Sequence, residues 1–305
     1  MSADTYYAGR RAAAKAAAAS GDAAEPVAVA RAPGFYADVP EQEYHGDRDS
    51  LSVSGAKTLL KAPALFRWQQ DHPVHKDVFD FGSAAHALVL GAGMESIYIA
   101  PYNDWTKRKG PEGGVQYTTD EKRIAQEDGL SPILPKEWLK VCDMAAALAS
   151  HRLAMRLLSE GRPEVSAYAP DEATGVMRRC RFDWLGSTIV TDYKTADSAD
   201  PDLFVKTAVN FGYHMQHPYY LDLAADLGHP AAAFAFIVQE KTEPYLVTVV
   251  ELPPELVDIG RARNRRALER FRDCTESGLW PGYVSDDTFA QPAAPRWALY
   301  QEMTA

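Results

Sequence analysis

Apolar and polar positions alternate with two different periods along the chain, and this divides the sequence into strand-like and helical segments. Strands are predicted at 163–168, 176–185 and 188–194, where β-branched and aromatic residues alternate with polar ones between turn-rich breaks. Three-to-four spacing predicts helices, and two more apolar runs predict strands. The expected helices are 52–60, 79–91, 136–159, 202–209, 214–227 and 254–276, and the further strands are 231–240 and 245–252.

This order of elements predicts an α/β fold, with a mixed central β-sheet flanked by helices on both faces. The chain has 305 residues, of which 46% are hydrophobic, enough for one sizeable core. Three regions are expected: an Ala-rich flexible tail at 1–34, one domain at 35–290 and a C-terminal tail at 291–305. The polar, Gly/Pro-bearing stretch 101–131 predicts a long loop that orders on substrate.

Two classes of protein are disfavoured by composition. No apolar run approaches the roughly 20 residues of a membrane helix, and the start of the chain lacks the apolar stretch of a secretory signal, so a cytoplasmic protein is expected. The three cysteines contain no C-x-x-C pair. A disulfide framework and a four-cysteine metal cluster are therefore excluded, and reduced structural thiols are expected.

The formal charge of −10 argues against a generally basic surface for nucleic acid, because duplex binding depends on Lys and Arg contacts with phosphates. Any DNA contact would be local, and Arg178, Arg179 and Arg181 are the candidates. Strand alternation places Arg178 on the opposite face from the other two. A second arginine-rich stretch, 261–272, fits an exposed helix face with acidic partners equally well.

The candidate chemistry lies in the predicted hairpin. Asp183 ends one strand, Gly186-Ser187 reverses the chain, and the next strand ends in Asp192-Tyr193-Lys194. Alternation puts Asp192 and Lys194 on one face, and the hairpin brings Asp183 beside Asp192. Two carboxylates can hold Mg²⁺ while an ammonium assists attack on a phosphodiester. Taken alone, an Asp-x-Lys at a strand end fits a solvated rim better.

Further matches surround this hairpin. Glu164, Arg181-Phe182-Asp183, Asp192-Tyr193-Lys194-Thr195 and the Gln216…Tyr220 pair resemble, in order and spacing, the RecB-like form of the PD-(D/E)XK nuclease superfamily. Segments 52–54, 81–90, 243–245 and 274–283 are similar to the RecE-type phage recombination exonucleases. The resemblance spans about residues 43–284 and implies a restriction-endonuclease-like core.

The resemblance also implies an activity. Members of this family are Mg²⁺-dependent exodeoxyribonucleases that degrade linear double-stranded DNA 5′→3′ and leave 3′ single strands for recombination by an annealing protein. The implied assembly is a toroidal homotetramer around DNA, and Mn²⁺ is expected to substitute for Mg²⁺.

Site residues follow from the same resemblance. It implies His86, Asp183, Asp192 and the Tyr193 carbonyl as metal ligands, and Lys194 as the catalytic lysine. It further implies that Glu164 binds metal-bound water or a second ion, and that Gln216 and Tyr220 brace the lysine and the scissile phosphate. Without the resemblance, His86 on an apolar helix would be taken for a core histidine. Pro218 is harmless only if its helix starts near Gln216.

Two alternatives remain open. One is another RecB-like DNA nuclease with structure-specific or endonucleolytic action, which would cut closed circles. The other is a non-catalytic DNA-binding module of the same fold, which would not bind metal. The presence of Asp183, Asp192 and Lys194 favours a catalyst over such a module.

Overall fold

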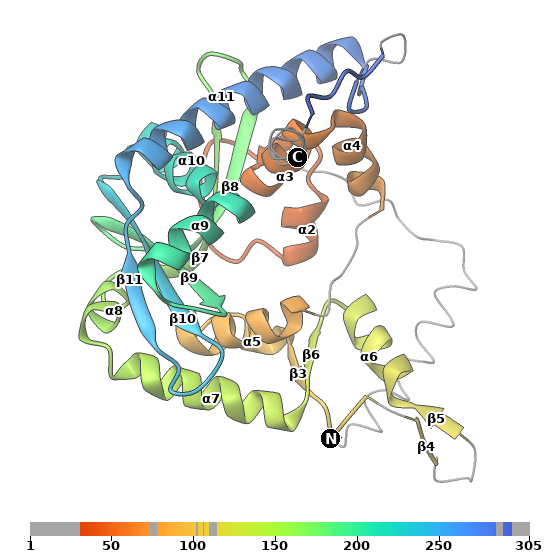
Figure 1. Ribbon diagram of the computed structural model, residues 1–305, viewed down its shortest axis with the longest axis vertical. Coiled ribbons are helices and arrows are strands. Elements are labelled where there is room, and N and C mark those ends of the chain that lie inside the picture. The colour runs from red at the N-terminus through yellow and green to blue at the C-terminus, as the bar shows by residue number, and fades with distance from the viewer. Residues whose placement is uncertain are drawn as a thin grey trace, which may run out of the picture.

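A computed structural model describes residues 31–72, 78–101, 103–105, 107–109, 115–284 and 289–294 (Figure 1). The expected tail at 1–34 therefore lies almost entirely outside the described residues. Its last residue, Gly34, begins the first strand. Within the described residues, no helix has the length and apolar character needed to cross a membrane. All three cysteines are free, and Cys180 and Cys274 are buried.

A seven-stranded mixed sheet forms the centre of the molecule, as the strand pattern predicted. Its order is β1-β7-β8-β9-β10-β11, with β2 added beside the start of β8. Neighbours along this path run antiparallel except β9 and β10, which are parallel, and β2 is parallel to β8. The strands are β1 Gly34–Tyr36, β2 Ser50–Ser52, β7 Arg162–Pro170, β8 Met177–Leu185, β9 Ile189–Ala196, β10 Ala233–Glu240 and β11 Val247–Val250.

Helices cover both faces of this sheet (Figure 1). The larger core lies between the sheet and α3 Val53–Lys61, α9 Pro201–Phe211, α10 Tyr213–Asp226 and α11 Pro254–Ser277. A second core lies on the opposite face, where α5 Val78–Leu90 and α7 Pro135–Ala149 pack against Tyr193 and Ile237. Strand alternation explains both cores, because Val190 and Phe236 face the first while Tyr193 and Ile237 face the second.

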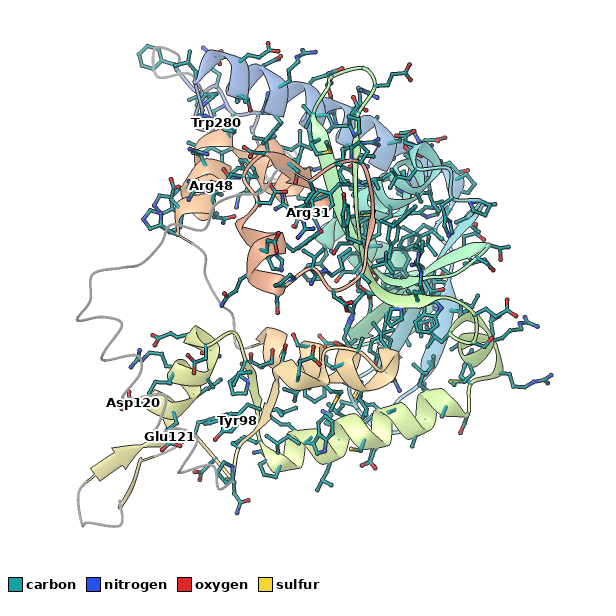
Figure 2. The ribbon with its side chains drawn as sticks, turned by 180° about the vertical axis from the view of Figure 1, so that it is seen from behind. Arg31, Arg48, Tyr98, Asp120, Glu121 and Trp280 are labelled. Carbon is teal, nitrogen blue, oxygen red and sulfur yellow. The ribbon has the colours of Figure 1, made fainter. Side chains whose placement is uncertain are left out.

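The remaining elements are short and lie around the two cores. They are α2 Glu41–Gly46, α4 Pro63–Asp71, α6 Thr118–Glu127, α8 Arg152–Leu157, the 3₁₀ turn Met94–Ser96, and the strand pairs β3 Ile97–Ile99 with β6 Ser131–Ile133 and β4 Lys107–Lys109 with β5 Val115–Tyr117. Side-chain contacts tie the edges together. Arg48 lies 2.8 Å from Asp71, Arg31 pairs with Glu43, and Trp280 stacks on Phe66 with ring centroids 5.8 Å apart (Figure 2).

Two expectations about elements were wrong. The expected helix 136–159 is interrupted at Ser150 and His151. Residues 118–127 of the expected loop form α6, whose first turn carries Asp120 and Glu121, acids that a helix N-terminus stabilises.

Pro218 lies inside α10, which begins at Tyr213 rather than near Gln216. A proline there has no N–H to donate to the His214 carbonyl, four residues earlier. Helix α11 lies against this turn, where Asn264 Nδ2 donates to the Met215 carbonyl at 2.9 Å. Gly260 of α11 lies so close that a Cβ would sit 1.8 Å from the His214 carbonyl oxygen. The turn that contains Pro218 is thus packed closely against α11.

Candidate active site

Strands β8 and β9 separate at the point where the acidic residues lie. They pair only at Trp184↔Thr191 and Leu185↔Val190, next to the turn at Gly186. One step further on, the Tyr193 backbone N–H donates to Asp183 Oδ2 at 2.9 Å, so a carboxylate replaces the next rung of the ladder. On the same edge of β8, strand β2 pairs with residues 177–179. The edge between these two partners is therefore open at Asp183.

Three possible metal ligands converge at this opening. One ligand atom each from His86 of α5, Glu164 of β7 and Asp183 of β8 lie within 4.8 Å of one another. His86 Nδ1 is 3.4 Å from Asp183 Oδ2, and the His86 ring lies edge-on to the Tyr193 ring with centroids 5.1 Å apart. A helix on one face of the sheet and two neighbouring strands thus contribute to one cluster.

Glu164 has an unusual backbone. Its φ of 51° is left-handed, a conformation that non-glycine residues rarely adopt. The β7–β8 register passes through Pro163↔Trp184 and Val165↔Phe182, which puts Glu164 opposite Asp183 with no regular bridge between them. Such local strain costs about 1–3 kcal/mol and is concentrated at functional sites. This distortion accompanies the approach of the Glu164 carboxyl to the cluster.

Asp192 and Lys194 lie beside this cluster on the same face of β9, as predicted. Lys194 Nζ is 2.5 Å from Asp192 Oδ2, and Gln216 Nε2 donates to Asp192 Oδ1 at 2.5 Å. Asp192 is 1% exposed, and its Oδ2 pairs with Lys194. A carboxylate oxygen has two lone pairs, so Oδ2 retains capacity for a cation.

Burial and mutual repulsion set the charges of these groups. Burial, followed by the charge of Asp183, raises the pKa of Glu164 to about 7 and that of Asp192 to about 6. Burial also raises the pKa of Asp183. For Lys194, the nearby carboxylates Asp192 and Asp183 outweigh burial and raise its pKa, so the ammonium is charged at neutral pH. Three clustered carboxyls with one lysine would gain from a further positive charge.

The donor set fits a hard divalent cation. Carboxylate oxygens are the ligands of Mg²⁺, and an imidazole nitrogen is also compatible with Mn²⁺. Burial, then Lys194, lowers the pKa of His86 to about 4, so the ring is neutral and able to coordinate at pH 7. The ligand atoms of His86, Glu164 and Asp183 are close enough to one another to bind a single ion, with Asp192 adjacent. Metal coordination by these four residues and by the Tyr193 carbonyl stays a prediction.

A second lysine, which sequence reasoning missed, reaches the site from α3. Lys57 Nζ donates to the Phe211 carbonyl at 3.0 Å and lies 5.9 Å from the centroid of the Tyr213 ring. Lys194 Nζ lies 5.2 Å from the centroid of the same ring. Burial, followed by the charge of Lys194, lowers the pKa of Lys57 to about 8. No sequence spacing relates residues 57 and 194, because helix packing alone brings them together.

Tyr220 packs in the larger core, with its ring edge-on to Phe182 and Phe234. Gln216 contacts Asp192 rather than Lys194. Bracing of the lysine by Gln216 is therefore indirect, through the carboxylate that both residues contact. A contact of Tyr220 with phosphate stays a prediction.

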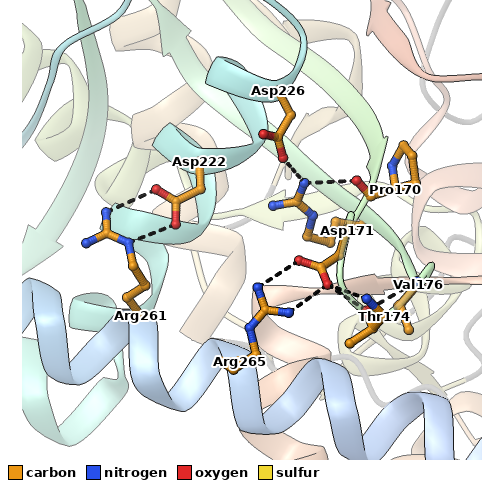
Figure 3. Close-up of polar contacts among 9 residues, drawn as sticks. Pro170, Asp171, Thr174, Val176, Asp222, Asp226, Arg261 and Arg265 are labelled. Atoms are coloured by element: carbon orange, nitrogen blue, oxygen red, sulfur yellow. Dashed lines mark hydrogen bonds and ion pairs between the residues drawn. The ribbon is translucent and has the colours of Figure 1, made fainter.

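The three candidate DNA-binding arginines all have partners within the protein. Arg178, 4% exposed, pairs with Asp226 and donates to the Pro170 carbonyl at 3.2 Å. It lines a surface pocket of about 610 Å³, where Arg265 pairs with Asp171 and Arg261 with Asp222 (Figure 3). These contacts join the β7–β8 loop to α10 and α11, which gives Arg178 a structural role.

Arg179 and Arg181 face the other side, as alternation predicted. Arg179 is 7% exposed and donates to Ser50 Oγ at 2.9 Å. Arg181 donates to the Val39 carbonyl at 2.6 Å and lies 4.4 Å from the centroid of the Tyr44 ring. DNA contact by these arginines stays a prediction, and the structure shows them joining the N-terminal segment to β8.

A family comparison gives the same assignment as this geometry. Residues 52–288 match the family model described as a PDDEXK-like domain of unknown function (DUF3799). The chain belongs to this family. The expected PD-(D/E)XK nuclease fold is thereby confirmed, whereas the closer likeness to RecE-type enzymes stays a prediction.

Solved structures include a similar chain. A crystal structure of a protein described as a "putative exonuclease" from Eubacterium rectale superposes with a TM-score of 0.55 at 13% sequence identity, covering 85% of this chain and 95% of that chain. A search of curated proteins finds no match. Family and fold together support a nuclease, and PDDEXK nucleases typically use divalent metals.

Proposed function

We propose that this protein is a Mg²⁺-dependent exodeoxyribonuclease that degrades linear double-stranded DNA from its ends. The observation that carries the proposal is the convergence of His86, Glu164 and Asp183 within 4.8 Å, with the Asp192–Lys194 ion pair alongside. A hard-cation site next to a charged lysine is what phosphodiester hydrolysis requires. Mn²⁺ is expected to substitute, since the donor set includes an imidazole.

Each residue has a distinct task in the proposed reaction. His86, Glu164 and Asp183 would hold a divalent ion, which would supply neutralisation of the phosphoryl oxygens and activation of the attacking water. Lys194 is protonated near Asp192 and Asp183, so it stabilises negative charge on the phosphoryl group rather than accepting a proton. Asp192 holds the lysine in place, and Gln216 fixes the other oxygen of Asp192.

Finer features of the proposal rest on the resemblance noted in the sequence. They are 5′→3′ polarity, a 3′ single-stranded product, delivery of that product to an annealing protein in phage-type recombination, and a toroidal homotetramer around DNA. In such a ring, basic side chains would line the channel around the duplex while the outer surface stays acidic. This arrangement is consistent with a net charge of −10.

Digestion of a linear duplex labelled separately at each 5′ and 3′ end, with Mg²⁺ or with EDTA, tests the proposal. We expect Mg²⁺-dependent loss of the 5′ labels as short products, 3′ strands that persist, and no cutting of a closed circle. Asp183→Asn should abolish the activity. Cutting of the circle would instead show an endonuclease, and a lack of both cleavage and metal binding would show a non-catalytic module.

A further inference from the structure

The junction between α9 and α10 presents an aromatic ring to solvent. Phe211, the last residue of α9, is 62% exposed, and Gly212 joins it to Tyr213 in a left-handed conformation with φ +72°. Single exposed apolar side chains are ordinary, and Leu203 and Val209 on α9 are also exposed. Exposure alone therefore does not distinguish Phe211.

Phe211 is distinguished by its position as the outermost ring of a stacked column of aromatic side chains. The rings of Phe211 and Tyr213 stack with centroids 5.9 Å apart and an interplanar angle of 22°. Tyr213 also stacks on the buried Phe204, at 6.1 Å and 28°. The column thus runs from the core to the surface, and its middle ring carries Lys194 at 5.2 Å from its centroid. An exposed flat surface is held next to the proposed catalytic lysine.

Lys57 provides a positive charge at the same place. Its ammonium donates to the Phe211 carbonyl at 3.0 Å and lies over the Tyr213 ring. An ammonium has three donors, so hydrogens remain for an anionic oxygen. Gly212 leaves room for this side chain, because a Cβ there would come within 2.5 Å of Lys57 Cδ. The Phe211 ring and the two ammonium groups therefore all lie around the Tyr213 ring.

We propose that Phe211 and Lys57 form a nucleotide subsite beside the scissile position, in which a base stacks on Phe211 and the phosphate of that nucleotide pairs with Lys57. The subsite rests on the proposed nuclease function and extends it to the form of the substrate. A base needs a free face to stack on a protein ring, so the occupant is a terminal, frayed or unpaired nucleotide. Aromatic stacking accepts any base, which suits an enzyme that digests DNA without regard to sequence.

A substrate–variant cycle tests the stacking partner. Duplexes with one abasic nucleotide at the first, second or third position from each end are compared with intact DNA under single-turnover conditions. At one position, wild-type protein should lose about 5- to 100-fold in cleavage rate. Phe211→Leu should lose a similar factor on intact DNA and no more on the abasic duplex, because both changes remove one contact. Leu203→Ala, on the same helix, should behave as wild type.

The outcomes separate the subsite from the proposed function. Suppose that wild-type protein cleaves DNA, but the rate losses caused by Phe211→Leu and by the abasic nucleotide multiply when the two are combined. That result would overturn the subsite and leave the nuclease proposal intact. Normal cleavage of every abasic duplex by the wild-type protein would do the same. If wild-type protein cleaves no DNA, the nuclease proposal fails first. The contact of Lys57 with phosphate is tested with DNA that carries a neutral methylphosphonate next to the nucleotide that stacks on Phe211. This replacement should slow cleavage by the wild-type protein about 10-fold. Lys57→Met should cleave the methylphosphonate DNA no more slowly than it cleaves normal DNA.

Since Lys57 also holds the end of α9, melting temperatures of its variants are needed. Lys57→Arg should restore both the rate and the sensitivity to methylphosphonate if the charge contacts phosphate. Equal sensitivity of wild type and Lys57→Met would overturn the phosphate contact.

Discussion

At the residue scale, Asp192 connects the acidic cluster to the lysine. One of its oxygens contacts Lys194 and the other accepts from Gln216, and the side chain is almost completely buried. Replacing either partner leaves a buried carboxylate oxygen without compensation, which costs about 1–3 kcal/mol or more for a charged group. The lysine and the glutamine therefore stabilise the site as well as serving its chemistry.

Lys194→Met is expected to reduce Mg²⁺-dependent cleavage by about 10²- to 10³-fold, because the variant lacks the ammonium that faces the phosphoryl group. Single-turnover digestion of a linear duplex measures this loss, and calorimetry should still detect Mg²⁺ binding. Lys241→Met is the matched control, since Lys241 pairs with Asp197 at 2.7 Å, and Asp197 is 94% exposed. Equal activity of the two variants would contradict the role of Lys194.

Glu164→Gln is expected to stabilise the metal-free protein, and more at pH 8 than at pH 5. The pKa of Glu164 rises on folding from 4.5 to about 7, so the folded state holds its proton more tightly and stability falls as pH rises through that window. Glutamine does not ionise, so the Gln variant does not lose stability in this way. The difference in unfolding free energy between Glu164→Gln and wild type should grow by on the order of 1–2 kcal/mol from pH 5 to pH 8.

Urea unfolding in EDTA at both pH values measures the difference between Glu164→Gln and wild type. In saturating Mg²⁺ the order should reverse at pH 8, because the ion then pairs with the carboxylate of the wild type. A gain that is the same at both pH values would show that ionisation of Glu164 plays no part.

At the element scale, the hairpin β8–β9 was predictable from the sequence. The fork, at which the two strands separate beyond Trp184 and Thr191, was not. Alternation and the Gly186-Ser187 turn gave both strands within two residues at each end. Glycine is required there, because a Cβ at Gly186 would lie 2.4 Å from the Ile189 carbonyl oxygen. The fork depends on β2, far away in sequence, taking the edge of β8 that β9 leaves. Local patterns contain no signal for such a shared edge.

The residues of the candidate site also fall into those that the sequence could predict and those that it could not. Asp183, Asp192 and Lys194 are close in sequence and carry a recognisable spacing, whereas Lys57 reaches them only through the packing of α3 against the α9–α10 junction. The pairing of the buried Arg178 with the exposed Asp226 likewise depends on α10 lying over β8. A charged residue on a strand gives the same sequence signal whether it meets DNA or an aspartate.

The same glycine-to-alanine substitution is expected to have opposite effects on stability in two helices, because only one of the two glycines lies in a close helix contact. Gly260→Ala should destabilise the protein by several kcal/mol, since its Cβ would overlap the His214 carbonyl at 1.8 Å. Gly82→Ala in α5 has no neighbour within 4 Å, so it should stabilise the protein by about 0.5–1 kcal/mol. Thermal unfolding of both variants measures the pair. Similar effects in both helices would refute close packing at Gly260.

At the scale of the whole molecule, the candidate metal ligands come from layers that are otherwise held together by apolar packing. His86 belongs to α5, on the face with the smaller core, while Glu164 and Asp183 belong to the central sheet. An ion held by all three cannot stay coordinated when α5 detaches or the sheet opens. Its binding free energy is therefore linked to unfolding of the whole domain.

Divalent ions are accordingly expected to raise the melting temperature of the wild-type protein. At a concentration 100 times the dissociation constant the gain is about 2.7 kcal/mol, or roughly 5 °C for a domain of this size. Mn²⁺ should act at lower concentration than Mg²⁺, because the imidazole of His86 favours it. Asp183→Asn should abolish the shift, and the exposed Asp197→Asn should retain it. An undiminished shift in Asp183→Asn would place the ion elsewhere and remove the basis of the proposed chemistry.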